Sequence, residues 1–286
     1  MIKYNPKDWF SFIFKFHKSD TFRQLLPLMF FMALYTICIW ILERYYLNLD
    51  ENSPIKNISL LHSLLGFVIS LLLAYRTNTA YDRWWEGRKM WGALTNSSRN
   101  LAIKLSVILP KENHGYFKKI IPFYAKVLKN HLTLEETSFE LFDDMILEPH
   151  HHKPNQVAQL MFKKIHEHYK LNIISGDELI VLNNEIQSFT DICGACERIK
   201  NTPIPYSYSS FIKKFIFFFI MSLPFSYVIV LSLWAVPVVV FVFYVLVSLE
   251  MIAEEIEDPF GNDANDLPME KITTSISTHI DEIFNR

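Results

Sequence analysis

HSLLGFVISLLLAYRTNTAYDRWWEGRKMW, residues His62–Trp91, is the segment around which the rest of the chain is organised. It is uncharged and mostly apolar as far as Tyr75, and then turns abruptly polar and basic, with Trp84 and Trp85 just beyond the change. An apolar helix of this length can cross a bilayer, and tryptophans gather where such a helix meets the headgroups. The segment therefore predicts one helix that crosses the membrane and continues into the cytoplasm.

Three bulky side chains recur at helical spacing within this segment. Phe67, Leu71 and Tyr75 stand four residues apart, so they line up on one face of the helix. Such a stripe either packs against a neighbouring helix, as most intramembrane faces do, or forms the wall of a pore.

Polar residues around the stripe favour the pore. His62, Ser63 and Ser70 are unusual on a lipid-facing helix. Just past the stripe, Arg76 and Asn78 begin a run that is polar enough to line the entrance of a wet vestibule. A ring of such stripes would form an apolar constriction of the kind that gates by dewetting.

Two further stretches of the chain are long and uncharged. The first, Gln24–Leu42, is about long enough for one membrane span. The second, Phe215–Leu249, would rise roughly 50 Å as a single helix, which exceeds a bilayer core and fits two spans. Pro224 and Pro237 bracket the expected turn between them. Together these stretches predict an all-α membrane protein with four transmembrane helices in two hairpins.

The distribution of charge predicts the orientation of these hairpins. Between Arg76 and Lys129 there are eleven lysines and arginines and three acidic residues, whereas the link between the first two spans, Tyr45–Ile58, has Lys56 as its only basic residue. Basic segments near span ends stay in the cytoplasm. The middle of the chain is therefore expected to be cytoplasmic and, with even numbers of crossings on either side, so are both termini.

The predicted boundaries divide the chain into five parts. These are an N-terminal interfacial segment (1–23), a transmembrane hairpin with the pore-lining helix (24–83), a cytoplasmic helical domain (84–204), a second transmembrane hairpin (205–256), and an acidic segment with a C-terminal helix (257–286). In the cytoplasmic domain helical patterns cover 84–110, 113–131, 136–148, 155–170 and 176–199, and the last helix covers 269–284. No strand alternation appears.

Two groups of residues resemble metal or redox motifs. His150–His152 are potential zinc or copper ligands, but consecutive histidines cannot all face one ion in a helix, and the adjacent Pro154 favours an exposed loop. Cys193 and Cys196 have CxxC spacing without the βαβ context of a redox site, so small residues packed in a helix are expected. The chain shows no phosphate-binding glycine loop, HExxH or Ser-His-Asp arrangement, and is not expected to be an enzyme.

The acidic segment Glu254–Asp266 mixes carboxylates, side-chain amides and a glycine, which is the ligand set that calcium prefers. It lacks the spacing of an EF-hand, and acidic loops are commonly only solvated. The residues alone leave a calcium site and a solvated loop equally open.

Three separated motifs resemble those of the bestrophins. They are AYDRWWEGRKMWG (80–92), ERIKNTPIPYSYS (197–209) and AEEIEDPFGNDANDLP (253–268). The chain is most similar to the prokaryotic branch, which also resembles the plant thylakoid voltage-dependent chloride channels, and the similarity covers essentially the whole chain. It implies a homopentamer around a central pore, each subunit giving four membrane helices and a large cytoplasmic helical region.

The resemblance also implies site residues. Placing the family's Arg-Trp-Trp on Arg83–Trp85 puts the pore neck on Phe67, Leu71 and Tyr75. A second, cytoplasmic aperture falls near Asp177, Ile180 and Val181.

In the family's acidic segment this chain keeps Glu255, Asp258, Asp263 and Asp266 but interrupts the dense aspartate run of the animal members. The interruption argues against calcium gating of the animal type. We expect the segment to be structural, bracing neighbouring subunits, and we expect no cofactor.

The function implied by this resemblance is a pentameric ion channel of the bacterial inner membrane. An acidic aperture at Asp177 would concentrate cations, so the sequence favours monovalent cations such as sodium, although the neck carries no charge. An anion channel, for chloride, is the alternative, and a membrane-anchored scaffold or signalling protein is the third. The expected partners are further copies of the chain, the lipid bilayer and the permeating ions, without nucleic acid.

Overall fold

The computed structural model describes residues 21–49, 53, 57–135, 147–148 and 150–285. These residues form helices and connecting turns, with no strand among them, which confirms the all-helical prediction for the described chain. Most of the expected interfacial segment (1–23) and of the expected helix 136–148 lie outside the described residues.

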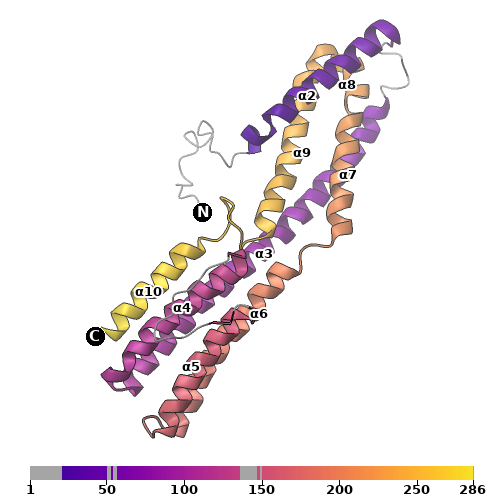
Figure 1. Ribbon diagram of the computed structural model, residues 1–286. Coiled ribbons are helices and arrows are strands. Elements are labelled where there is room, and N and C mark those ends of the chain that lie inside the picture. Colours follow the sequence, from indigo (N-terminus) through magenta and orange to yellow (C-terminus); the bar gives the residue numbers. More distant parts are fainter. Residues whose placement is uncertain (1–20, 50–52, 54–56, 136–146, 149, 286) are drawn as a thin grey trace. The chain divides into compact units, whose positions relative to one another are not determined.

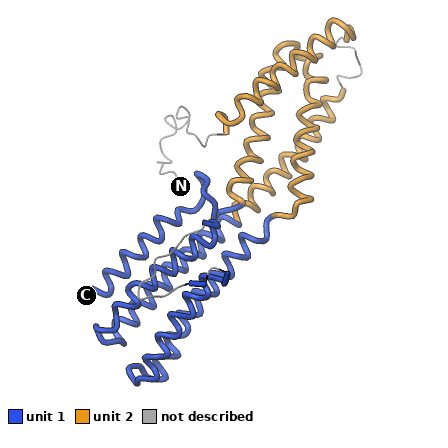
Figure 2. The backbone as a smooth tube through the Cα atoms, viewed as in Figure 1, with its two compact units in different colours: residues 1, 83–203, 258–286 blue, residues 2–82, 204–257 orange. Residues whose placement is uncertain are grey.

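The chain forms two compact units, shown in Figure 2. One contains residues 83–203 and 258–286, and the other contains residues 2–82 and 204–257. Helix α3 (Ile58–Ile108) is continuous and supplies residues to both units. The segment His62–Trp91 is thus part of one helix, as predicted.

The apolar unit is built from α2 and the first part of α3, with three later helices. The bounds are Thr21–Ile41 for α2, Tyr206–Ser222 for α7, Pro224–Leu231 for α8 and Ala235–Glu257 for α9. Its hydrophobic core includes Met32, Ile69, Leu73, Ile216, Phe219 and Val239. This core fixes which face of α3 is turned into the subunit.

Within the described part of the chain, three helical stretches are long and apolar enough to cross a membrane: Thr21–Tyr46, Ile58–Ile108 and Tyr206–Glu257. The third turns back on itself at a short 3-10 helix, Ser232–Trp234, between the two prolines that were expected to bracket the turn. Figure 1 shows α7 and α9 running alongside each other from this turn. The indole of Trp40 donates to Ser232 Oγ at 3.0 Å and holds the turn against the end of α2.

The other unit packs the remainder of α3 with four shorter helices. They are α4 (His114–Thr133), α5 (Lys153–Lys170), α6 (Gly176–Asn201) and α10 (Met269–Phe284). Trp91, Phe117, Tyr124, Phe189 and Ile280 are among the fully buried side chains of its core. Because α10 lies along α4, the end of the chain folds back onto the first helices of this unit.

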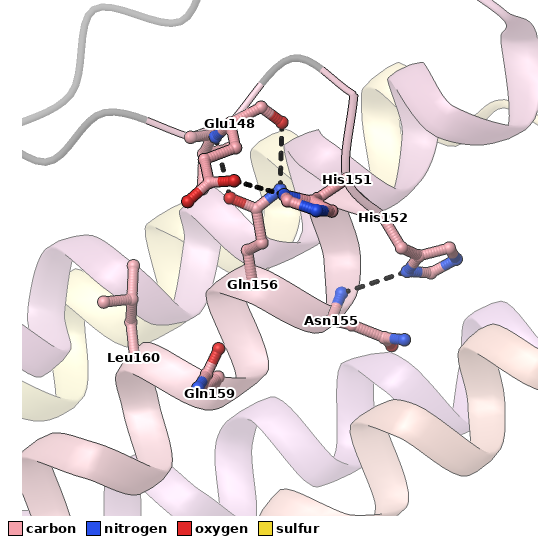
Figure 3. A pocket seen from close by; sticks show the side chains of 8 residues that line it. Glu148, His151, His152, Asn155, Gln156, Gln159 and Leu160 are labelled. Carbon is pink, nitrogen blue, oxygen red and sulfur yellow. Dashed lines mark hydrogen bonds and ion pairs between the residues drawn. The ribbon is translucent and has the colours of Figure 1, made fainter.

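The structure corrects one expectation for the histidine run. His150 and His151 are exposed, as expected of a polar loop. His152 is not: its Nδ1 accepts a hydrogen bond from the backbone nitrogen of Asn155 at 3.2 Å and so caps α5 (Figure 3), and its Nε2 contacts Glu197. The prediction of an exposed loop is wrong for His152 because this histidine is the N-cap of α5, whereas His150 and His151 precede the helix.

The two cysteines of the CxxC pair are buried within α6, which confirms the packing interpretation. Burial is the main cause that raises the pKa of each thiol, Cys193 and Cys196, to about 12. Both thiols are therefore protonated at neutral pH and lack the thiolate that redox chemistry needs.

Candidate functional site

The bulky stripe of α3 lies on an exposed face of the apolar unit. Phe67, Leu71 and Tyr75 are 69 %, 48 % and 60 % exposed. The stripe therefore does not serve as a packing seam within the subunit. It is a surface that meets lipid, another subunit or a pore.

The opposite face of α3 is packed into the same unit. Ile69 and Leu73 belong to its core. His62 is buried as well, with Nδ1 at 2.8 Å from Ser226 Oγ and Nε2 at 2.9 Å from Ser222 Oγ. This histidine consequently joins α3 to the α7–α8 region and does not line a surface.

The serines next to the stripe are satisfied by their own helix. Ser63 donates to the carbonyl oxygen of Ser59 at 3.1 Å, and Ser70 donates to that of Gly66 at 2.7 Å. Because the hydroxyls already have acceptors, they can face an apolar environment at little cost. They therefore support a pore less strongly than their polarity suggested.

Arg76 differs most from its expected place. Its side chain is only 1 % exposed, so the expectation that it lines a vestibule entrance is wrong for this subunit. Arg76 Nη2 lies 2.7 Å from Glu257 Oε2, and Nε lies 3.6 Å from Glu250 Oε1. Glu257 also accepts from the backbone nitrogen of Ile204 at 2.7 Å, and thereby ties the end of α9 to the residues just before α7. Asn78, the other residue expected at the entrance, is exposed.

The ion pairs of Arg76 with the two glutamates were not predicted from the sequence. Glu250 directly ends the uncharged run Phe215–Leu249, and a carboxylate at that position usually has a partner. That position was the available signal. The sequence does not indicate which residue the partner is, because that depends on how the helices pack.

Parts of the three family motifs contact one another in the unit that contains residues 83–203 and 258–286. Arg83, from the first, donates through Nη1 and Nη2 to the carbonyl oxygens of Thr202 and Ile199, both at 2.5 Å. These carbonyls lie at the C-terminal end of α6, where a helix leaves acceptors without intrahelical partners and favours positive charge. Arg198, from the second motif, donates in turn to Glu86 at 2.5 Å.

The acidic segment is held by the same part of α3. Trp84 donates its indole nitrogen to the carbonyl oxygen of Asn265 at 2.9 Å. A Cβ on Gly87 would lie 3.0 Å from Pro259 and 3.1 Å from Phe260, so only glycine lets the segment pack this closely. The first motif is thus the surface on which both other motifs rest.

Within the acidic segment the carboxylates stabilise their own backbone. Asp266 is buried and accepts from the backbone nitrogen of Asp263 at 2.6 Å, and Asp258 accepts from that of Phe260 at 3.2 Å. Asp263 itself is exposed, and Glu255 belongs to α9 in the other unit. Among the described residues these carboxylates form no group of three able to share one metal ion.

The residues expected at the cytoplasmic aperture lie together at the start of α6. Asp177, Ile180 and Val181 are all exposed, so they share a surface of the first turns. Ser175 caps this helix in a reciprocal pair with Glu178, whose carboxylate accepts from the Ser175 backbone nitrogen at 2.7 Å. Those hydrogen bonds, from the backbone first and the hydroxyl second, lower the pKa of Glu178.

Comparisons with known proteins agree with the motif resemblance. Residues 1–282 match the family described as bacterial/fungal bestrophin protein. A voltage-dependent anion channel-forming protein of Nostoc sp. is 32 % identical over 290 residues, which span 97 % of this chain and 92 % of that protein. The voltage-dependent anion channel-forming protein YneE of Escherichia coli K12 is 28 % identical over 290 residues, 96 % of this chain and 91 % of that protein.

A solved structure shows the same fold. The crystal structure of a bacterial bestrophin homologue from Klebsiella pneumoniae matches with a TM-score of 0.83 at 25 % identity, covering 92 % of this chain and 99 % of that chain. The family match, the Nostoc relative and the shared fold each extend over nearly the whole chain. This protein therefore belongs to the bacterial and fungal bestrophins, a family of membrane ion channels and not of enzymes.

Proposed function

We propose that five copies of the chain surround a central pore whose neck is formed by Phe67, Leu71 and Tyr75 of each α3. The supporting observation is the contrast between the two faces of α3, one packed into its subunit and the other largely exposed. The exposed Asn78 and Thr79 follow the bulky face directly, and polar side chains facing a wet pore are less costly than the same side chains facing lipid. Ions would cross an apolar neck that conducts when wetted.

Below the neck, the route continues through a cytoplasmic vestibule to a second constriction at Asp177, Ile180 and Val181. Their shared exposure at the start of α6 supports this position. In this arrangement four crossings per subunit place both termini in the cytoplasm of a bacterium, and the protein is a multi-pass protein of the inner membrane.

The neck is tested by replacing Phe67 and Leu71 together with alanine and measuring ion flux from liposomes. Shorter side chains widen the constriction and remove apolar surface, so water and ions should enter more readily and flux should rise several-fold. Flux equal to that of the wild type would show that the stripe is not the neck.

A matched control is available on α2. Phe30 and Leu34 have the same residue types at the same spacing, and both are exposed. Replacing both with alanine should leave flux unchanged. An equal rise in both double variants would indicate a general loosening of the membrane region instead of a neck.

We propose anions, chloride in particular, as the permeating ions. The support is the description of the relatives of Nostoc and E. coli as anion channel-forming proteins. The experiment is a reversal potential in asymmetric sodium chloride. A value near the chloride equilibrium potential is expected, and a value near the sodium potential would overturn the choice.

Monovalent cations such as sodium are the second candidate. The observation in their favour is the exposed carboxylate of Asp177 beside the proposed aperture, which in a pentamer would form a ring of five negative charges. Against it, Asp177 lies in the first turn of α6, where acidic residues are favoured by the helix dipole without any role in permeation.

A further inference from the structure

Three side chains of metal-ligating types converge in the unit that contains residues 83–203, and none of them belongs to the proposed neck or aperture. His131 lies in the last turn of α4, His152 is the N-cap of α5 and Glu197 lies on α6. Their candidate ligand atoms all lie within 4.8 Å of one another, and among the described residues no other group of three histidine, cysteine or acidic side chains does so.

The cluster is compact and polar. Nε2 of His131 lies 2.6 Å from Glu197 Oε1, and Nε2 of His152 lies 2.5 Å from the same oxygen. The two imidazole rings meet edge to face, with centroids 4.6 Å apart. One carboxylate oxygen of Glu197 is therefore hydrogen-bonded to two imidazole nitrogens that come from separate helices.

Each member is held in place by its own element. Nδ1 of His152 accepts from Asn155 in the α5 cap (Figure 3), which turns its Nε2 toward Glu197. The three side chains are 30 %, 33 % and 27 % exposed, so the group is positioned by the fold and still open to water. Burial tends to raise the pKa of Glu197, but the hydrogen bonds from His152 and His131 outweigh it and lower that pKa, so the carboxylate is ionised at neutral pH.

We propose that His131, His152 and Glu197 form a binding site for a divalent transition metal of the zinc class. Two imidazole nitrogens and one carboxylate oxygen are the donor set of three-ligand zinc sites, in which water takes the fourth position. The partial exposure of all three side chains leaves room for that water. Calcium and magnesium are disfavoured because they prefer oxygen ligands.

The geometry requires only a small adjustment for the ion. Zinc–ligand bonds of about 2.0–2.2 Å in a tetrahedral arrangement separate the ligand atoms by roughly 3.3–3.5 Å. The two nitrogen–oxygen distances of 2.5 and 2.6 Å must therefore open by less than about 1 Å each. In the ion-free arrangement, protons on the Nε2 atoms occupy the space between the ligands.

Binding also moves protons. Each imidazole must present a lone pair at Nε2 to the metal, so its proton passes to Nδ1 of the same ring or to solvent. For His152 a proton on Nδ1 breaks the 3.2 Å bond from Asn155. Because of this lost bond, the expected affinity is weaker than that of a closed structural zinc site.

The ion would join the end of α4, the start of α5 and the C-terminal part of α6. These are chain positions separated by 45 and 66 residues. An ion that binds only the native state stabilises that state by RT ln(1 + c/Kd), where c is the concentration of free Zn²⁺. Zinc is thus expected to raise the thermal stability of the full-length protein independently of ion conduction.

The test uses the full-length protein in detergent, stripped with EDTA and then titrated with Zn²⁺ by calorimetry, with Co²⁺ as a spectroscopic probe. One ion per chain, a rise in Tm of a few degrees and the visible absorption of four-coordinate cobalt are expected. His131→Ala combined with Glu197→Gln should lower affinity at least about 100-fold, since even changes behind the ligands cost 10–100-fold.

Two comparisons keep the test specific. His150→Ala combined with His151→Ala removes neighbouring exposed histidines outside the cluster and should bind as the wild type does. Glu197→Gln alone retains the size of the side chain and an acceptor for both rings, so it separates loss of a ligand from loss of folding. Absence of saturable binding by the wild type, or equal binding by the cluster variants, would show that the three side chains form only a hydrogen-bonded latch.

Discussion

The environment of Arg76 in the structure differs from the one that its place in the sequence predicts. Its position at the polar end of an apolar helix predicts a residue that faces water, and it is instead buried against Glu250 and Glu257. A charge at that depth is retained only with partners of opposite sign. These ion pairs join α3 to α9, so the role of Arg76 is to fix the two helices against each other.

Replacing Arg76 with alanine should therefore destabilise the protein strongly. It leaves two carboxylates without their cation, and removing one partner of a buried ion pair costs about 3–5 kcal/mol. We expect a fall in Tm on the order of 10 °C in detergent, measured by thermal unfolding.

The control is Lys213→Ala, which breaks the exposed pair between Lys213 and Glu254. An exposed pair contributes about 0–1 kcal/mol, so this variant should unfold close to the wild type. Equal stability of the two variants would show that the buried ion pairs of Arg76 contribute little to the stability of the fold.

The two cysteines of α6 lead to a prediction about reactivity. Because the pKa of each thiol is raised to about 12, both are protonated at pH 8 and present no thiolate. In a Cys38→Ser variant, which removes the exposed cysteine, maleimide should label the native protein very slowly and the denatured protein at once. Rapid labelling of the native variant at pH 8 would contradict the packed arrangement.

At the scale of elements, much of the fold was predictable because the sequence marks its own helix ends. The predicted ranges 113–131, 176–199 and 269–284 differ from α4, α6 and α10 by at most two residues. Ser175 before α6 and Pro268 before α10 are local signals of this kind. The shared face of Phe67, Leu71 and Tyr75 was predictable for the same reason, since helical spacing alone aligns these three side chains.

Contacts between elements could not be predicted in this way. His131, His152 and Glu197 come from three helices, and no spacing rule relates their positions. The partners of Arg76 likewise depend on how α3 packs on α9. Local patterns determine which residues share a helix face, whereas the packing of the core determines which faces meet.

The start of α6 offers a test of the proposed aperture. Asp177→Asn removes one negative charge per subunit from its first turn while keeping the shape of the side chain. If this turn faces the ion route, the reversal potential in asymmetric sodium chloride should shift toward the chloride equilibrium potential, because cations are no longer concentrated there.

Asp191→Asn is the matched control for the aperture. It is exposed on the same helix about 21 Å further along the axis. The same shift in both variants would indicate a general effect of surface charge, and no shift in Asp177→Asn would move the aperture elsewhere.

At the scale of the whole molecule, the apolar unit has exposed faces that one chain cannot cover. Besides the stripe of α3, large apolar side chains are exposed on α2, α7 and α9, including Phe30, Phe31, Phe218 and Phe241. Lipid can cover a smooth apolar face, and neighbouring subunits can cover the rest. The proposed pore takes one helix from each subunit and needs several subunits to close a ring, so it depends on assembly.

Because the proposed pore depends on assembly, the conducting particle should contain five chains. In detergent the wild type should behave in light scattering as a particle whose protein mass is five times 33.7 kDa, and the same preparation should conduct ions after reconstitution. The Phe67→Ala, Leu71→Ala variant should keep the five-subunit mass while its flux rises, because its substitutions alter the pore surface and leave the packed face of α3 unchanged. A monomer without flux would favour a scaffold, and a monomer with flux would place the ion route within one subunit. Either result would remove the ring of five stripes on which the neck depends.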